Sequence, residues 1–268
     1  MDREKQYVAF IDILGFKKYV LDNIDSPENP YKMIEDIQST AHDFAETIDL
    51  DTVAFSDSIV FNSKKIEEKP NVKSYSFLSV INALQLAMLV IPELQCLPLR
   101  GGITVGDYYV NDEKNIFYGE AFVRAYELES KIANYPRIVI DPKGFDLNPR
   151  KMIEANQLYD KIINSDEKFK KIFSTHSFES EKTLRLYPVA YDFDGVLFCN
   201  YLYSQRRIGD RTWAANTNSV LTEHKLFIQR KTKESDNNLK LMQKYSWMKN
   251  YHNWFCQPFD EFQEYIIQ

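Results

Sequence analysis

The amino-acid sequence predicts an α+β sandwich, in which helices pack against a sheet. Short runs rich in β-branched and aromatic residues alternate with longer stretches whose apolar residues recur every three or four positions. These segments follow the order β-α-β-β-α-β and then α-β, which is typical of helices that cover one sheet face. Apolar residues make up 44% of the 268-residue chain, so a substantial core can form.

The first predicted strand and helix lie near the N-terminus. Residues 7–14 are short, apolar and β-branched, and Gly15-Phe16 is expected to open the turn that follows them. The next segment has apolar residues at helical spacing, which predicts a helix with one buried face. These residues are Tyr31, Ile34, Ile37, Ala41, Phe44 and Ile48.

Two strands and an apolar helix are expected next. Residues 51–62 predict a hairpin whose tip carries the turn-forming sequence Ser56-Asp57-Ser58. Residues 74–91 predict a helix that stops near Pro92. The later predictions are strand over 99–110, helix over 119–133, strand over 137–140, polar helical sequence over 145–185 and a buried strand pair over 187–203.

The last part of the chain differs in composition. From residue 204 it is basic and polar, and it ends in an aromatic-rich helix. We therefore expect a main domain over residues 1–203 and an extension over residues 204–268 that packs on the core or on a dimer partner. The aromatic residues of the final helix are Trp247, Tyr251, Trp254 and Phe255.

Charge and cysteine content restrict the class of protein. The net charge is −6 and the pI is near 5.4, whereas a general nucleic-acid binder should be basic. Cys96, Cys199 and Cys256 are far apart and lack zinc-ligand spacing, which fits a reducing compartment. The charged start has no signal-peptide pattern, and no apolar stretch is long enough to span a bilayer. We expect a cytoplasmic protein that binds neither membrane nor nucleic acid.

Two aspartates stand out because each lies in an apolar, strand-forming run. Asp12 is near the end of the first predicted strand, and Asp57 is at the tip of the hairpin. A carboxylate is costly to bury unless it is paired or binds a metal, so two of them suggest a shared divalent cation. The carbonyl of Ile13 is a plausible further ligand. The alternative is that Asp12 caps the following turn and Asp57 is an ordinary turn residue.

The turn after Asp12 is a candidate phosphate site. Gly15-Phe16 is expected to lead into a helix, whose first backbone N–H groups and positive dipole end favour anions. Lys17 and Lys18 follow directly and add positive charge. Oxygen ligands, a phosphate site and a divalent cation together predict phosphate chemistry.

The order and spacing of four segments resemble the class III nucleotide cyclases, over roughly residues 7–140. The segments are Phe10-Ile11-Asp12-Ile13-Leu14-Gly15-Phe16, Ser56-Asp57-Ser58, Leu99-Arg100-Gly101-Gly102-Ile103 and Gly119-Glu120-Ala121-Phe122-Val123-Arg124-Ala125-Tyr126-Glu127-Leu128-Glu129. The resemblance implies a ferredoxin-like cyclase domain, a homodimer with composite active sites, and two Mn²⁺ or Mg²⁺ ions per site. Asp12 and Asp57 would be the metal carboxylates and Gly15-Phe16 the triphosphate turn.

The positions at which this chain departs from that family bear on which nucleobase its substrate carries. Its purine cyclases carry a Lys or Glu four residues before the second metal aspartate, where this chain has Val53. Strand periodicity puts Val53, Phe55 and Asp57 on one face. The second purine-reading position is Ile116, three residues before Gly119. Neither side chain can form a hydrogen bond, so recognition of a purine edge is weakened.

The family's transition-state Asn and Arg align with Val123 and Glu127, so the cationic role is expected elsewhere. Arg100, beside two glycines that allow close backbone approach, is the first choice. The alternative for Arg100 is a surface charge at a strand end. For Arg124, which we include among the substrate-binding candidates, a solvated or interface position on its helix is the competing interpretation.

This pattern is similar to the bacterial Pycsar pyrimidine cyclases, and so are Asp192-Phe193-Asp194-Gly195 and Lys244-Tyr245-Ser246-Trp247. The resemblance implies synthesis of cyclic UMP from UTP, or cyclic CMP from CTP, during phage infection, with the product activating a separate effector. UTP is the first choice. A catalytically inactive dimeric nucleotide sensor is the alternative, because Val123 and Glu127 replace catalytic groups.

One motif also resembles an unrelated enzyme class. Asp192-Phe193-Asp194-Gly195 is similar to the nucleophile motif of haloacid-dehalogenase phosphatases. That motif should open a long α/β domain, and only about seventy residues follow it. A buried strand with aspartates at its start is the preferred interpretation.

Overall fold

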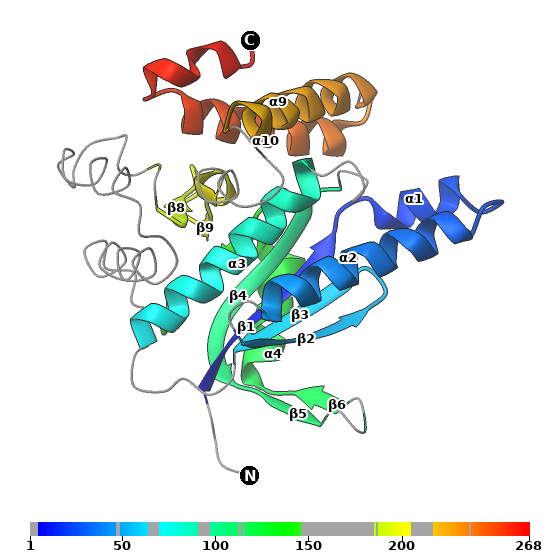
Figure 1. The fold of residues 1–268 in the computed structure, drawn as a ribbon, viewed down its shortest axis with the longest axis vertical. Helices are drawn as coiled ribbons and strands as arrows, with labels where there is room; N and C mark the ends of the chain where they lie inside the picture. Colours follow the sequence, from blue (N-terminus) through cyan, green and yellow to red (C-terminus); the bar gives the residue numbers. More distant parts are fainter. Residues whose placement is uncertain are drawn as a thin grey trace.

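A computed structural model describes most of the chain (Figure 1). The described residues are 5–46, 49–63, 70–90, 97–111, 114, 116–145, 185, 187–204, 217–235 and 237–268. A seven-stranded sheet has the order β2-β3-β1-β4-β7-β9-β8, and β5 and β6 form a separate hairpin. The strands are β1 Lys5–Ile13, β2 Leu50–Phe55, β3 Ser58–Ser63, β4 Leu99–Asp107, β5 Tyr109–Asn111, β6 Ile116–Tyr118, β7 Ile138–Ile140, β8 Val189–Tyr191 and β9 Leu197–Cys199.

The first four strands of the large sheet have ferredoxin-like topology. Their order is β2-β3-β1-β4, with β1 antiparallel to both β3 and β4. Helices α1 (Phe16–Asp22) and α2 (Glu28–Glu46) join β1 to β2, and α3 (Pro70–Val90) joins β3 to β4. The predicted α+β class and the β-α-β-β-α-β order are therefore confirmed.

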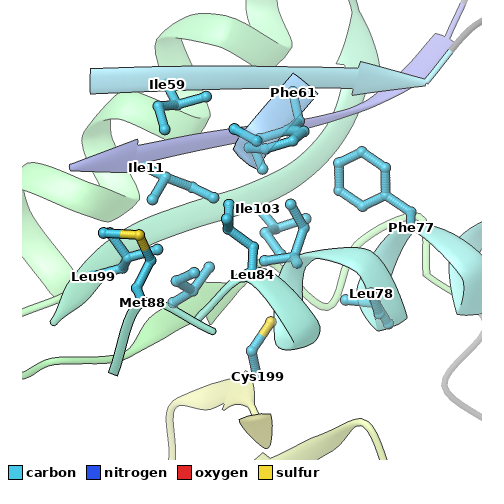
Figure 2. Packing of buried hydrophobic residues seen from close by; sticks show 14 of the residues in the cluster. Ile11, Ile59, Phe61, Phe77, Leu78, Leu84, Met88, Leu99, Ile103 and Cys199 are labelled. Atoms are coloured by element: carbon cyan, nitrogen blue, oxygen red, sulfur yellow. The ribbon is translucent and has the colours of Figure 1, made fainter. Parts of the chain in front are cut away.

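Strand alternation divides the core between the two sheet faces. Tyr7, Ala9 and Ile11 of β1 belong to a large cluster that includes α2 and α3, whereas Val8 and Phe10 belong to a smaller cluster on the opposite face. Figure 2 shows the large cluster from close by, with side chains from the sheet packed against those of α3. Residues labelled there include Ile11, Ile59, Phe61, Ile103, Phe77, Leu84 and Met88.

Helix α3 is mostly apolar and packs into two cores. Leu84 and Met88 belong to the cluster beneath the sheet, and Leu86 and Leu89 belong to a second cluster formed with the C-terminal helices. Those helices are α9 (Thr217–Glu234) and α10 (Leu239–Cys256), followed by the 3₁₀-helix η5 (Asp260–Tyr265). Figure 1 shows α9 and α10 packed together next to the end of α3.

The C-terminal core encloses a buried histidine pair. Nδ1 of His224 lies 2.9 Å from Nδ1 of His252, and His224 Nε2 lies 3.0 Å from the Tyr201 hydroxyl. His252 Nε2 donates to the carbonyl of Tyr265 at 2.9 Å. With both rings neutral, His224 Nδ1 must donate to His252 Nδ1, and Tyr201 must donate to His224. Every ring nitrogen therefore has one assigned role.

Helix α4 (Glu120–Glu127) covers β1 and β4 on the face opposite α2 and α3. Two glycines of β4 permit the close approach. A Cβ on Gly102 would lie 2.3 Å from the carbonyl oxygen of Ala125, and a Cβ on Gly106 would lie 3.4 Å from Ala121 Cβ. The helix continues as a π-helical turn, η3 (Leu128–Ile132), whose residues Leu128 and Glu129 lie beside Gly102 of β4.

Some details differ from the sequence predictions. Tyr31, expected on the buried face of α2, is exposed, and Met33 and Ala45 are buried with Ile37 and Ala41 instead. The side chains of a helix return to one face every three to four residues, and Tyr31 falls outside that stripe. The region 99–110 is divided into β4 and β5, and α3 starts at Pro70.

Other predictions fall on residues that the structure does not describe. Residues 146–184, Ile48, Cys96, Pro92 and the arginines at 206, 207 and 211 lie outside the described residues. The strand pair predicted over 187–203 is confirmed as β8 and β9, followed by the 3₁₀-helix η4 (Tyr201–Ser204). Within the described part of the chain, no helix is both long and apolar enough to cross a membrane.

Candidate active site

Asp12 and Asp57 meet at the end of β1. Strand β1 pairs with β3 so that Asp12 lies opposite Ser58, directly after Asp57 in the β2–β3 turn. The backbone N–H of Ile13 donates to the carbonyl of Asp57 at 3.1 Å. Ser56, in the same turn, has a positive φ of 54°. Strand pairing and the tight turn therefore bring together two carboxylates that are distant in sequence.

The Asp12 carboxylate is in an unfavourable place for a charge. Its side chain is 18% exposed. Burial raises the pKa of Asp12, the Arg100 guanidinium opposes that rise, and the adjacent Asp57 carboxylate adds to it. Two neighbouring carboxylates with incomplete compensation favour a cation that binds oxygen.

Arg100 lies beside the Asp12–Asp57 pair. In the β1–β4 ladder it lies directly opposite Asp12, and its Nε donates to Asp12 Oδ2 at 3.0 Å. Its Nη2 lies 2.6 Å from Oε1 of Glu129. Arg100 is therefore not a free surface charge at a strand end, because it bridges two carboxylates.

Glu129 is a part of the site that the sequence analysis missed. Its side chain is only 4% exposed, and burial raises its pKa, an effect that Arg100 opposes. A signal was present, since Ala121, Ala125 and Glu129 recur every four residues and share the helix face packed on β4. A carboxylate on that face must find a cation, and Gly102 lets the helix come close enough to Arg100.

The turn predicted to bind triphosphate adopts the expected form. Gly15 has φ +92°, a left-handed conformation that favours glycine, and α1 begins at the next residue. Phe16 is buried in the large core, so only its backbone N–H can face a ligand. Lys17 is exposed, and Lys18 pairs with Asp22 at 2.5 Å.

An aromatic wall borders the carboxylates on the α4 side. Phe55 is 39% exposed, and its ring centroid lies 5.7 Å from that of Phe117 in a stacked geometry. Phe10 lies 6.1 Å from Phe55 and 5.4 Å from Tyr126. Val53 is half-buried on the same strand face, opposite Val60. The wall offers apolar and stacking contacts rather than hydrogen bonds.

The other sequence candidates point elsewhere within this protomer. Ile116 is exposed on β6, and because its neighbour Phe117 turns towards Phe55, the Ile116 side chain faces the opposite side of the hairpin. Arg124 Nε donates to Oδ2 of Asp141 at 2.9 Å, just beyond β7. The structure therefore does not gather Ile116 and Arg124 around Asp12.

A metal fits the donor set, although the chain alone provides few ligands. Asp12, Asp57 and the Ile13 carbonyl are hard oxygen donors, which suit Mg²⁺ or Mn²⁺ when phosphates and water complete the shell. Among the described residues, no group of three or more His, Cys, Asp or Glu side chains has a metal-binding arrangement. Such a site would therefore bind metal together with a substrate's phosphates.

The aspartates that resemble a phosphatase motif have a structural role. Asp192 and Asp194 lie in the turn between β8 and β9, and both pair with Arg137, whose side chain is 0% exposed. Arg137 Nη2 lies 2.6 Å from Asp194 Oδ2, and this contact lowers the pKa of Asp194. Both carboxylates neutralise a buried cation, which does not fit the role of a nucleophile.

Fold and site together define a ferredoxin-like α+β domain with a paired-carboxylate centre at one end of its sheet. No protein-family model matches the sequence, and no curated protein matches it. Several solved cyclase structures show partial structural similarity.

The adenylyl cyclase CyaB from P. aeruginosa has a TM-score of 0.45 at 17% identity, covering 60% of this chain and 83% of that chain. The monomeric guanylyl cyclase domain of the RhoGC fusion protein from Blastocladiella emersonii has a TM-score of 0.43 at 14% identity, with coverages of 58% and 86%. Adenylate cyclases from Trypanosoma brucei in their monomeric state give 0.39 at 16% identity, with coverages of 51% and 73%. Values at this level do not place the chain in a family.

Proposed function

We propose that this protein is a metal-dependent pyrimidine nucleotide cyclase that converts UTP to 3′,5′-cyclic UMP and pyrophosphate. The observation that carries the proposal is the adjacency of Asp12 and Asp57 at the end of β1, with Arg100 bound to Asp12 at 3.0 Å. Paired carboxylates beside a helix-opening glycine turn suit a triphosphate with divalent ions.

The reaction is an internal displacement. The ribose 3′ oxygen bonds to the α-phosphorus and its proton passes to solvent, while the bond between the α-phosphorus and the bridging oxygen breaks and pyrophosphate leaves. Asp12, Asp57 and the Ile13 carbonyl would hold two Mg²⁺ or Mn²⁺ ions, which supply charge neutralisation and activation of the hydroxyl when bound. Arg100 adds fixed positive charge beside the phosphates, and Gly15-Phe16 offers backbone N–H donors.

The surroundings of the carboxylates support a pyrimidine base. Val53 and Phe55 present an apolar and aromatic surface, which can stack on a base but cannot hydrogen-bond a purine edge. Ile116 faces away from Asp12 in this protomer, and across a dimer it would supply no hydrogen bond either. UTP is our first choice of substrate and CTP is the alternative. The side chains of Val53 and Ile116 do not distinguish the exocyclic groups of the two bases.

A homodimer is part of the proposal. Large apolar side chains are exposed around α4 and the β5–β6 hairpin, and a second copy of the chain would cover them. These residues are Phe55, Ile116, Tyr118, Val123 and Tyr126. In such a dimer, groups from the partner would complete each site next to the exposed Phe55.

The biological role follows from the resemblance to the Pycsar cyclases. We propose that the cyclic nucleotide is made during phage infection and activates a separate effector protein. Infection of cells that carry the gene and its neighbours, with wild-type protein or Asp12→Ala, tests this role. Equal phage titres from the two strains would refute it.

The decisive test is product identification. Purified protein is incubated with equimolar ATP, GTP, CTP and UTP and Mn²⁺, and products are identified by mass spectrometry. Cyclic UMP should form and should be absent after chelation by EDTA or in Asp12→Ala and Asp57→Ala. Asp25→Ala, an exposed aspartate away from the site, is the matched control.

Three outcomes would change the conclusion. Cyclic CMP alone would identify a cytidylate cyclase. Nucleotide binding without any cyclic product would support the sensor alternative. Retained turnover in Asp12→Ala or Asp57→Ala would remove these residues from the metal site.

A further inference from the structure

Trp247 is one of several buried residues that hold helix α10 against the core. Trp247 Nε1 donates to Oδ2 of Asp192 at 2.6 Å, and its ring stacks on Tyr135 with centroids 6.0 Å apart and planes at 5°. Asp192 in turn pairs with the buried Arg137. The contacts of Trp247 therefore attach α10 to the segment that connects η3 and β7.

That attachment point adjoins the candidate active site. The Arg137 carbonyl accepts a hydrogen bond at 3.2 Å from the N–H of Gly101, the residue directly after Arg100. Lys244 precedes Trp247 by three residues, so it lies on the same helix face one turn towards the start of α10. Its ammonium is close enough to interact electrostatically with both Arg100 and Asp12.

Lys244 lies partly buried among charged groups. The side chain is half-buried, and no carboxylate among the described residues lies within ion-pair distance of it. Burial lowers the pKa of Lys244, and the Arg100 charge lowers it further, while Asp12 opposes this. Asp12 itself is already paired with Arg100. Because Asp12 and Glu129 both engage Arg100, the Lys244 ammonium remains available to an anionic ligand.

We propose that Lys244 binds the triphosphate of the substrate, so that the C-terminal extension completes the active site of its own chain. The identity of the substrate rests on the proposed cyclase function, but the phosphate-binding role does not require turnover. An ammonium provides a compact charge with three donors, which suits phosphate oxygens. The triphosphate would lie between Lys244, Arg100 and the metal ions held by Asp12 and Asp57.

A solvated lysine is the competing interpretation, and the helix provides a matched control for it. Lys240 lies one turn earlier on α10, is exposed, and also interacts with Lys244 electrostatically. If general positive potential attracted the anion, then loss of either charge would have a similar effect. If the Lys244 ammonium contacts the anion directly, then loss of Lys244 should weaken anion binding and loss of Lys240 should not.

The first test measures binding of inorganic tripolyphosphate with Mg²⁺ by isothermal titration calorimetry. Lys244→Met keeps the length of the apolar stem and should weaken binding on the order of tenfold or more, the usual effect of losing a charged hydrogen bond. Lys244→Arg should keep most of the affinity, and Lys240→Met should stay within about twofold of wild type. Thermal melts confirm that each variant is folded.

Three results would overturn the proposal: no binding to the wild-type protein, equal losses in Lys244→Met and Lys240→Met, or unchanged affinity in Lys244→Met. Kinetics with UTP and Mn²⁺ give a second measure, because Lys244→Met should raise KM more than it lowers kcat. If no nucleotide is cyclised but tripolyphosphate binding still depends on Lys244, the cyclase function fails and the phosphate site stands.

Discussion

Arg100 joins Asp12 to Glu129: its Nε lies 3.0 Å from Oδ2 of Asp12, and its Nη2 lies 2.6 Å from Oε1 of Glu129. The Arg100 guanidinium therefore pairs with the partly buried carboxylate of Asp12 and with the fully buried carboxylate of Glu129. The contact with Glu129 fixes the orientation of Arg100, because a guanidinium held at both ends loses its rotational freedom. The charge beside the metal carboxylates is therefore preorganised.

Arg100→Ala should lower turnover by about two orders of magnitude, as expected for the loss of one preorganised donor. It should also lower the melting temperature, because Glu129 would keep a buried charge without a partner. Adding Glu129→Gln to Arg100→Ala should recover much of the stability but none of the turnover. Recovery of turnover in the double variant would show that Arg100 acts only through stability.

Gly102→Ala should destabilise the protein by about 1–3 kcal/mol, the usual cost of overpacking. The added Cβ would lie 2.3 Å from the Ala125 carbonyl oxygen and 2.4 Å from Leu128 Cβ, so α4 must move away from β4. Gly106→Ala is the matched control on the same strand, because its Cβ would meet Ala121 Cβ at 3.4 Å. Urea unfolding of both variants provides the comparison, and equal losses would contradict the prediction.

The protein should lose stability as the pH falls from about 6.5 to about 4. Burial lowers the pKa of His252 from 6.5 to about 4, and burial with the His252 charge lowers that of His224 well below 6.5. In this pH range the unfolded chain binds protons that the folded protein excludes, so unfolding is favoured at lower pH. Each pKa unit corresponds to about 1.4 kcal/mol.

Urea unfolding at pH 8, 6 and 5 measures this effect. His252→Gln should reduce the difference in unfolding free energy between pH 8 and pH 5. His42→Gln, at an exposed position paired with Glu46, should leave that difference unchanged. A wild-type protein whose stability does not change over this range would contradict the prediction.

Asp192→Asn should reduce stability while leaving the chemistry intact. The carboxylate pairs with buried Arg137 and accepts from Trp247 at 2.6 Å, so its neutralisation leaves a buried cation undercompensated. The melting temperature should fall, and turnover per folded molecule at 20 °C or below should stay within about threefold of wild type. Complete loss of activity in a folded variant would support the nucleophile interpretation of this motif instead.

The sequence was sufficient to predict those parts of the candidate site that depend on strand periodicity and on turn-forming residues. Strand periodicity and the turn at Ser56-Asp57-Ser58 were sufficient to expect Asp12 and Asp57 close together, because adjacent antiparallel strands bring them there. The sequence also predicted that Gly15 lies in the turn before a helix, and the structure confirms this. The roles of these residues in catalysis remain predictions.

The residues that were missed depend on tertiary packing. Glu129 reaches Arg100 only because glycines let α4 approach β4. The sequence named Lys244 only within a family motif, because its position depends on the attachment of α10 to Asp192. Arg124 was included among the substrate-binding candidates, yet it binds Asp141. A charged residue on a helix has many possible partners, and its sequence position does not select among them.

The packing of α3 into two cores limits how this chain can be shortened or recombined. Its Leu86 and Leu89 belong to the C-terminal core, while Leu84 and Met88 belong to the core beneath the sheet. Deleting the C-terminal helices would expose an apolar stripe on α3, so the shortened protein should aggregate. The helices after β9 therefore cannot be exchanged as a portable module.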